Sequence, residues 1–165
     1  LLFFTLIFLI FFRIITVEGA SMEPTPSNGD RLLISNLFYT PQDGDVIIFS
    51  IHGLRFFGYP DRDSALVKRV IATEGESVTI DFTKGTVMVN GELLNENYAT
   101  ETRDREDMEE IETFTVPEGK LFVMGDNRQH STDSRDDTIG FVDMRNVIGK
   151  VLFRFMPLSS IGTVE

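Results

Sequence analysis

The sequence predicts a mostly β protein built from antiparallel sheets. Its 165 residues contain many short apolar or β-branched runs with turn residues between them, and they show little helical periodicity beyond residue 17. Many short strands with few helices are typical of sheets that pack together or close partly into a barrel. We therefore expect one β domain over residues 18–165, shaped as a partly open barrel.

The expected strands follow one another along the chain. Thr83-Lys84-Gly85 joins two alternating runs into a hairpin, and Asn90-Gly91 marks the next turn. The expected strands are residues 31–34, 45–49, 66–71, 77–82, 86–90, 92–94, 113–116, 120–124 and 147–155.

The N-terminal run is apolar enough to belong in a membrane. Residues 1–12 are Leu, Phe and Ile apart from one Thr, and Ile14, Ile15 and Val17 extend this character past Arg13. The run is shorter than the roughly 20 residues that a transmembrane helix needs, and the chain begins with Leu. We expect residues 1–17 to be the end of a truncated transmembrane helix. A removed signal sequence and a buried core helix are the alternatives.

Composition excludes several classes of protein. The net charge of -11 argues against a general nucleic-acid binder, and the absence of cysteine excludes disulfides and thiolate metal sites. Acidic residues are concentrated in an expected insertion over residues 98–112, which reads as a solvated loop or short surface helix. A metal site there lacks a recognisable ligand pattern. We expect no metal and no cofactor.

Two residues carry the possible chemistry. Ser21 stands a few residues after the apolar run, and Lys68 lies inside an apolar strand. A serine hydroxyl becomes a good nucleophile when a base takes its proton, and a desolvated lysine can be that base. Lys68 pointing outward from an amphipathic strand is the alternative. A polar loop, residues 124–135, is either a structural turn or a layer that holds the base.

Four segments, in order, resemble the conserved boxes of bacterial type I signal peptidases, which remove signal peptides from exported proteins. Residues 153–158 resemble the C-terminal part of that family, so the resemblance covers nearly the whole chain. The four segments are Gly19-Ala20-Ser21-Met22-Glu23-Pro24-Thr25, Gly29-Asp30-Arg31-Leu32-Leu33, Lys68-Arg69-Val70-Ile71 and the stretch from Gly125-Asp126-Asn127-Arg128 through Ser131 to Asp133-Ser134-Arg135.

The resemblance implies a Ser–Lys dyad, with Ser21 as nucleophile and Lys68 as general base. It implies that Ser131 orients the lysine amine and that the Ser21 N–H donates to the oxyanion. A second oxyanion donor is left open, because Gly19 stands where one branch of the family has a serine. The residues implied to brace the site through ion pairs are Arg69, Asp126, Asp133 and Arg135.

The resemblance also implies the partners. Signal peptides would bind as an added strand, with small residues such as alanine before the cut. The residues implied to line their pockets are Val17, Met22, Leu66 and Val67. The chain would be bound to the lipid bilayer of the cell membrane, with its catalytic domain on the extracytoplasmic side. Phe56, Phe57 and Tyr59 either enter the membrane interface or pack in the core.

Three other functions stay open at this stage. A Ser-His-Asp hydrolase would use Ser21 with His52 or His130 and Asp133. Self-cleaving repressors pair a Ser-Met with a later lysine on a related fold, but they carry a DNA-binding domain where this chain has its apolar run. An inactive membrane-anchored module that binds peptides is the third, and the presence of both Ser21 and Lys68 argues against it.

Overall fold

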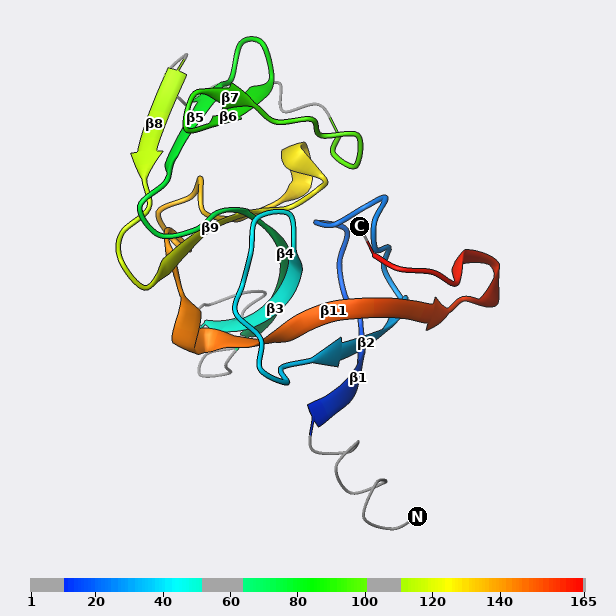
Figure 1. The fold of residues 1–165 in the computed structure, drawn as a ribbon. Helices are drawn as coiled ribbons and strands as arrows, with labels where there is room; N and C mark the ends of the chain where they lie inside the picture. The colour runs from blue at the N-terminus through cyan, green and yellow to red at the C-terminus, as the bar shows by residue number, and fades with distance from the viewer. Residues whose placement is uncertain (1–10, 52–63, 101–110, 165) are drawn as a thin grey trace.

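The computed structural model describes residues 11–51, 64–100 and 111–164. They form two antiparallel sheets, which confirms the mostly β prediction (Figure 1). The larger sheet has the strand order β1-β2-β11-β3-β4-β9-β10, and the smaller has the order β7-β6-β5-β8. The larger sheet consists of β1 (Phe12–Thr16), β2 (Arg31–Ser35), β3 (Val46–Ile51), β4 (Ser64–Ala72), β9 (Lys120–Met124), β10 (Val142–Asp143) and β11 (Val147–Met156).

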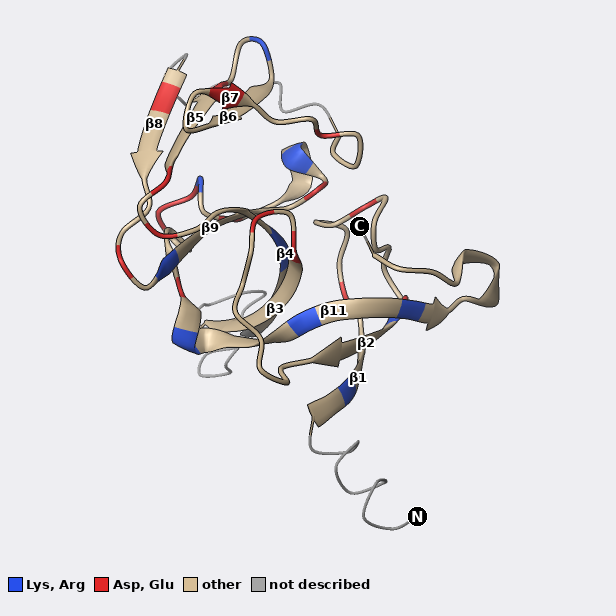
Figure 2. Cartoon of the chain, viewed as in Figure 1, with Lys and Arg blue, Asp and Glu red and all other residues tan. Residues whose placement is uncertain are grey.

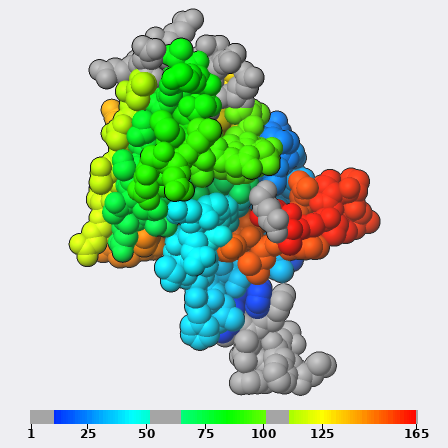
Figure 3. All heavy atoms as spheres, turned by 45° about the horizontal axis from the view of Figure 1, so that its top comes forward, coloured from blue at the N-terminus to red at the C-terminus, as the bar shows by residue number. Residues whose placement is uncertain are grey.

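The smaller sheet consists of β5 (Ser77–Asp81), β6 (Thr86–Val89), β7 (Glu92–Leu93) and β8 (Ile111–Thr115), and it lies on the near face in Figure 3. The described residues also form three short 3-10 helices: η1 (Arg128–His130), η2 (Met144–Asn146) and η3 (Leu158–Ser160). The larger sheet curves strongly in Figure 1, but its edge strands β1 and β10 pair with β2 and β9 and not with each other. The described strands therefore form no closed barrel.

The N-terminal prediction needs a correction. Residues 1–10 lie outside the described part of the chain, but Phe12–Thr16, expected as the end of a transmembrane helix, is the edge strand β1. Phe12 and Ile15 are half-buried and the other three residues are exposed, and the strand gains backbone pairing with β2 from Phe12↔Ser35 to Thr16↔Arg31. In the described residues, no helix has the length and apolar character to span a bilayer.

The acidic insertion expected over residues 98–112 has different bounds in the structure. Residues 101–110 lie outside the described part, whereas Ile111 and Glu112 belong to β8, which pairs with β5. On the other side of the gap, Thr100 N–H donates to the Asp126 carbonyl (2.9 Å) and Tyr98 is packed against Arg69. The aromatic residues Phe56, Phe57 and Tyr59 fall outside the described residues as well.

Three apolar clusters hold the sheets. One packs the smaller sheet on β4 and β9 through residues such as Ile80 and Phe122. A second lies between β1, β2, β3 and β11 and contains Ile48 and Met22. The third contains Ile47 and Phe49. Because consecutive side chains of a strand point to opposite faces, Ile47 and Ile48 enter different clusters. The second cluster borders the candidate site.

Candidate active site

Ser21 lies on a loop that leaves β1 and returns to β2. The loop is closed at its base, where Val17 N–H donates to the Asp30 carbonyl and Gly29 N–H donates back to the Val17 carbonyl, each at 2.9 Å. Gly29 has φ +87°, a left-handed conformation that glycine adopts without strain. Asp30 binds the Ser27 N–H (2.9 Å) and Arg154 of β11 (3.0 Å). Ser21 is therefore carried on a braced loop.

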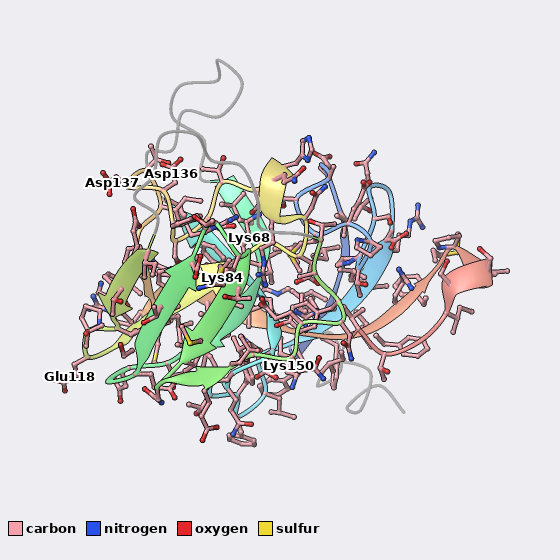
Figure 4. The ribbon with its side chains drawn as sticks, turned by 90° about the horizontal axis from the view of Figure 1, so that it is seen from above. Lys68, Lys84, Glu118, Asp136, Asp137 and Lys150 are labelled. Atoms are coloured by element: carbon pink, nitrogen blue, oxygen red, sulfur yellow. The ribbon has the colours of Figure 1, made fainter. Side chains whose placement is uncertain are left out.

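Lys68 reaches this loop from β4, whose backbone pairs with β3 at Lys68↔Ile47. Its Nζ lies 2.6 Å from Ser21 Oγ, and the residue is only 2% exposed. Figure 4 shows Lys68 near the middle of the molecule, whereas Glu118 and Asp136 lie at the periphery. Burial lowers the pKa of Lys68 to about 8; Asp133 and Asp126 raise this pKa and Arg135 lowers it further. An amine with this pKa is neutral in roughly one molecule in ten at pH 7.

Two buried ion pairs surround the lysine. Arg69 binds both Asp126 oxygens (2.9 and 2.8 Å), and its guanidinium lies 3.8 Å from the centre of the Tyr98 ring. Arg135 binds both Asp133 oxygens (2.7 and 2.8 Å). Burial raises the pKa of Asp133, but the hydrogen bonds and charge of Arg135 outweigh it, so the net shift of this pKa is downward. Burial is the main reason that the pKa of Asp126 is raised.

The loop over residues 17–30 is called the nucleophile loop, after the role predicted for Ser21. Gly125 brings this loop and the polar loop into close contact. Its N–H donates to Asp133 (2.9 Å), and a Cβ at this position would lie 2.2 Å from Ser131 Oγ and 2.3 Å from the Ser21 carbonyl oxygen. Only a residue without a side chain fits there. Ser131 is buried, and its side chain is one of the groups that lower the pKa of Asp133. The predicted lysine-orienting serine is thus packed beside the Ser21 backbone.

A cavity of about 240 Å³ opens beside Ser21. It is lined by all four predicted pocket residues, Val17, Met22, Leu66 and Val67, and by Ile15, Thr16, Glu18, Ser21, Ile48 and Ala65. Its walls come from β1, the nucleophile loop, β3 and β4. The predicted catalytic and pocket residues therefore meet at one place.

Some contacts of the site were not anticipated. Asn127 binds the nucleophile loop twice: its N–H donates to the Ser21 carbonyl (3.1 Å), and its side-chain amide donates to the Ala20 carbonyl (3.0 Å). Arg128 donates to the Gly125 carbonyl (3.0 Å) and to Glu96 (2.9 Å). The polar loop contained Asn127 and Arg128, but Glu96 is 32 residues away from Arg128 and no local pattern indicates the pair.

The histidine alternative is not supported by the described contacts. His130 Nδ1 lies 3.3 Å from Asn127 Oδ1, and Asp133 is bound by Arg135 and Gly125. His52 lies outside the described residues. Among the described residues, the basic side chain within hydrogen-bond distance of Ser21 Oγ is that of Lys68.

Residues 1–156 match the family model described as signal peptidase, peptidase S26. The chain belongs to this family. It is 39% identical to the probable signal peptidase I-1 of Synechocystis sp., over 88% of this chain and 72% of that protein. It is 34% identical to the signal peptidase I of Bacillus licheniformis, over 90% of this chain and 79% of that one.

A solved structure agrees with this assignment. The crystal structure of a signal peptidase I from Enterococcus faecalis has a TM-score of 0.51 and 34% identity, covering 68% of this chain and 97% of the other. The S26 family consists of serine peptidases, so the chain is a peptide hydrolase. Its function within the signal peptidase I group is the removal of signal peptides from preproteins.

Proposed function

We propose that Ser21 and Lys68 form the catalytic dyad of this signal peptidase. The observation that carries the proposal is the 2.6 Å approach of Lys68 Nζ to Ser21 Oγ, made by a lysine that is buried and has its pKa lowered to about 8. Neutral Lys68 takes the hydroxyl proton as Ser21 Oγ attacks the peptide carbonyl. The scissile C–N bond then breaks, the leaving amine receives that proton, and the signal peptide remains as an ester on Ser21.

Hydrolysis of the ester completes the cycle. Lys68 takes a proton from water, the resulting hydroxide attacks the ester, and the proton returns to Ser21 as its oxygen leaves. The Ser21 N–H donates to the oxyanion in both steps. Ser131 acts as a positioning residue for Lys68, and its packing beside Gly125 and the Ser21 backbone supports that role. The ion pairs of Arg69 with Asp126 and Arg135 with Asp133 hold the surrounding loops in place.

The cavity beside Ser21 supports cleavage after small residues. The cavity has a volume of about 240 Å³ and is lined by Val17, Met22, Leu66, Val67 and their neighbours. This volume leaves room for small substrate side chains such as alanine. The exposed part of β1 offers an edge on which an extended peptide can add as a strand. Selection for alanine at two alternate positions before the cut follows, because alternate side chains of a bound strand point to the same face.

The apolar N-terminal sequence supports attachment to the bilayer, with the catalytic domain on the extracytoplasmic side. Signal peptides are themselves membrane-inserted, and a shared bilayer raises the effective concentration of enzyme and substrate. Anchoring therefore compensates for a shallow pocket, whose discrimination is only about 1–3 kcal/mol per methylene.

The test is cleavage of a precursor with alanine at both recognition positions by the purified chain in detergent. Wild type should cleave it, and Ser21→Ala and Lys68→Ala should each lose nearly all turnover. His130→Ala, made in the same polar loop, should retain activity. An active Lys68→Ala variant, or an inactive His130→Ala variant that is folded, contradicts the dyad.

A further inference from the structure

Asn127 holds both peptide units that flank the Cα of Ser21. Its side-chain amide donates to the Ala20 carbonyl (3.0 Å), and its backbone N–H donates to the Ser21 carbonyl (3.1 Å). The first carbonyl belongs to the peptide unit before the Ser21 Cα, and the second belongs to the unit after it. Because each unit is planar, their orientations set the two backbone dihedral angles of Ser21. One residue of the polar loop therefore fixes the backbone of the predicted nucleophile.

The Ala20 carbonyl shares its peptide unit with the Ser21 N–H. In a trans peptide the C=O and N–H bonds point in opposite directions, so holding the carbonyl sets the direction of the N–H. A hydrogen bond to the carbonyl oxygen also draws electron density toward it, which strengthens the N–H as a donor. Glu23 N–H donates to the same carbonyl (3.1 Å) and adds to this polarisation. The Asn127 amide thus acts on the group predicted to bind the oxyanion.

The charges of the nucleophile loop make the strength of this donor important. Figure 2 shows acidic segments and no basic one on the loop, whose carboxylates are Glu18, Glu23 and Asp30. The Gly19 N–H, a further backbone donor of the loop, is bound by Asn28 Oδ1 (3.0 Å). An oxyanion at Ser21 therefore meets a neutral N–H on a loop of negative charge. Such a donor contributes most when it is already aimed at the developing charge.

We propose that Asn127 is a positioning residue that aims and polarises the Ser21 N–H as the oxyanion donor. This inference rests on the proposed function, in which that N–H donates to the oxyanion. The Ala20 carbonyl can only accept, so it needs the NH₂ end of the amide; the other end, Oδ1, lies 3.3 Å from His130 Nδ1. An ionised aspartate of nearly the same size has no proton to donate. The role is therefore specific to the amide.

A peptide aldehyde and the corresponding peptide alcohol test the role, because only the aldehyde forms an oxyanion. The Ser21 hydroxyl adds to the aldehyde carbon: a C–O bond forms, the carbonyl π bond opens onto its oxygen, and Lys68 takes the hydroxyl proton. The alcohol fills the same cavity without this bond. Both ligands carry alanine at the two recognition positions. Measurements are made in detergent at pH 9.5, where Lys68, with its pKa of about 8, is mostly neutral.

Asn127→Ala should lower kcat at least about tenfold and leave KM within about twofold of wild type. Its affinity for the aldehyde should fall by about the same factor as kcat, with the affinity for the alcohol unchanged. Asn127→Asp keeps the size of the side chain, so it tests the same donor if the alanine variant does not fold, and it should lose at least as much.

The matched control is Asn28→Ala. It removes another asparagine bond to the backbone of the same loop, but this bond is to the Gly19 N–H and not to the Ala20–Ser21 peptide unit. Its kcat and its affinities for both ligands should stay within about twofold of wild type. An equal loss in Asn28→Ala and Asn127→Ala would show that any loosening of the loop has the effect, and would overturn the inference.

Two further results overturn it. One is a wild-type kcat in folded Asn127→Ala and Asn127→Asp. The other is a parallel loss of affinity for aldehyde and alcohol, which would mean that Asn127 only shapes the cavity. Ser21→Ala tests the proposed function separately, because it should abolish both cleavage and the extra affinity for the aldehyde. If it does so while the Asn127 variants behave as wild type, the dyad stands and this inference fails.

Discussion

Lys68 Nζ and Ser21 Oγ lie 2.6 Å apart although 47 residues separate them in the sequence. Ser21 stands on the loop between β1 and β2, whereas Lys68 belongs to β4 in the middle of the larger sheet. Asn127 holds the nucleophile loop through the Ser21 and Ala20 carbonyls, and Gly125 allows the polar loop to approach it closely. The contact therefore depends on three segments of the chain meeting at one point.

Activity should depend on the protonation of Lys68. Because burial lowers its pKa to about 8, kcat/KM should rise about tenfold per pH unit below 8 and level off above it. Lys68→Arg should be inactive at every pH, because a guanidinium does not give up its proton. The measurement is kcat/KM between pH 6 and pH 10. A profile that is flat over this range would exclude a lysine base.

The same burial should cost the enzyme stability. The folded state holds Lys68 with a pKa of about 8, below lysine's ordinary value of 10.5, so it binds fewer protons than the unfolded state between these two values. Lysine's contribution to stability therefore improves as pH rises from 8 to 10.5 and is least favourable below 8. Lys68→Met should be more stable than wild type at pH 7 by roughly 1–3 kcal/mol. Denaturant unfolding at pH 7 and pH 10.5 tests this, and an equal gain at both values would contradict it.

Removing the charge of Asp133 and removing the charge of Arg135 should shift the pH profile of kcat/KM in opposite directions. Asp133 raises the pKa of Lys68 and Arg135 lowers it. Asp133→Asn should therefore shift the acid limb to lower pH, and Arg135→Gln should shift it to higher pH. Each change leaves a buried charge without its partner and should cost on the order of 3–5 kcal/mol of unfolding free energy. Shifts in the same direction would show that the residues act only by holding the fold.

Gly125→Ala should abolish activity by separating the two loops. The new Cβ would meet Ser131 Oγ at 2.2 Å and the Ser21 carbonyl oxygen at 2.3 Å, and the backbone atom cannot move without displacing the nucleophile. We expect at least a hundredfold loss of kcat. Gly162→Ala is the control, because a Cβ there meets nothing within 4 Å. A Gly125→Ala variant that keeps wild-type kcat would show that the loops need not approach so closely.

Ile48→Ala should enlarge the cavity and relax the preference for small residues. Ile48 lines the cavity, so its truncation should make room for a larger substrate side chain. The rate on a precursor with valine before the cut, divided by the rate on one with alanine there, should rise about tenfold. Ile47→Ala removes the same side chain from the neighbouring position, which belongs to a different apolar cluster. It should destabilise the protein by a similar 2–5 kcal/mol without changing the preference. If Ile48→Ala and Ile47→Ala gave the same ratio of cleavage rates on the valine and alanine precursors, Ile48 would not line the pocket that selects these residues.

Local patterns were enough to predict most strands. The hairpin at Thr83-Lys84-Gly85 and the runs that became β2, β3, β9 and β11 stand where alternation and turn residues placed them. The sequence was misleading at Phe12–Thr16, because the apolar character of the N-terminal run continues past Arg13 into an edge strand. Pairing with β2 decides that structure, and such pairing is not a local property.

The candidate site was predicted by motif, and the structure adds how its parts are held. Ser21, Lys68 and the four pocket residues meet as the motif order implied. The pairing of Arg128 with Glu96 and the stacking of Tyr98 on Arg69 could not be predicted, because each joins segments about thirty residues apart. The need for glycine at position 125 could not be predicted either. The atoms that crowd its Cα belong to Ser131 and Ser21, and they come close only in the folded chain.

The position of β1 has a consequence for the substrate under the proposed attachment to the bilayer. Ile15 and Thr16 at the end of this strand line the cavity, so only Phe12, Arg13 and Ile14 of β1 precede it, a distance of about 10 Å at 3.3 Å per extended residue. If lipid ends where β1 begins, a precursor has to cross this distance as an extended chain before its scissile bond reaches Ser21. The strand would then set a minimum number of residues between the lipid-embedded part of a precursor and its cleavage point.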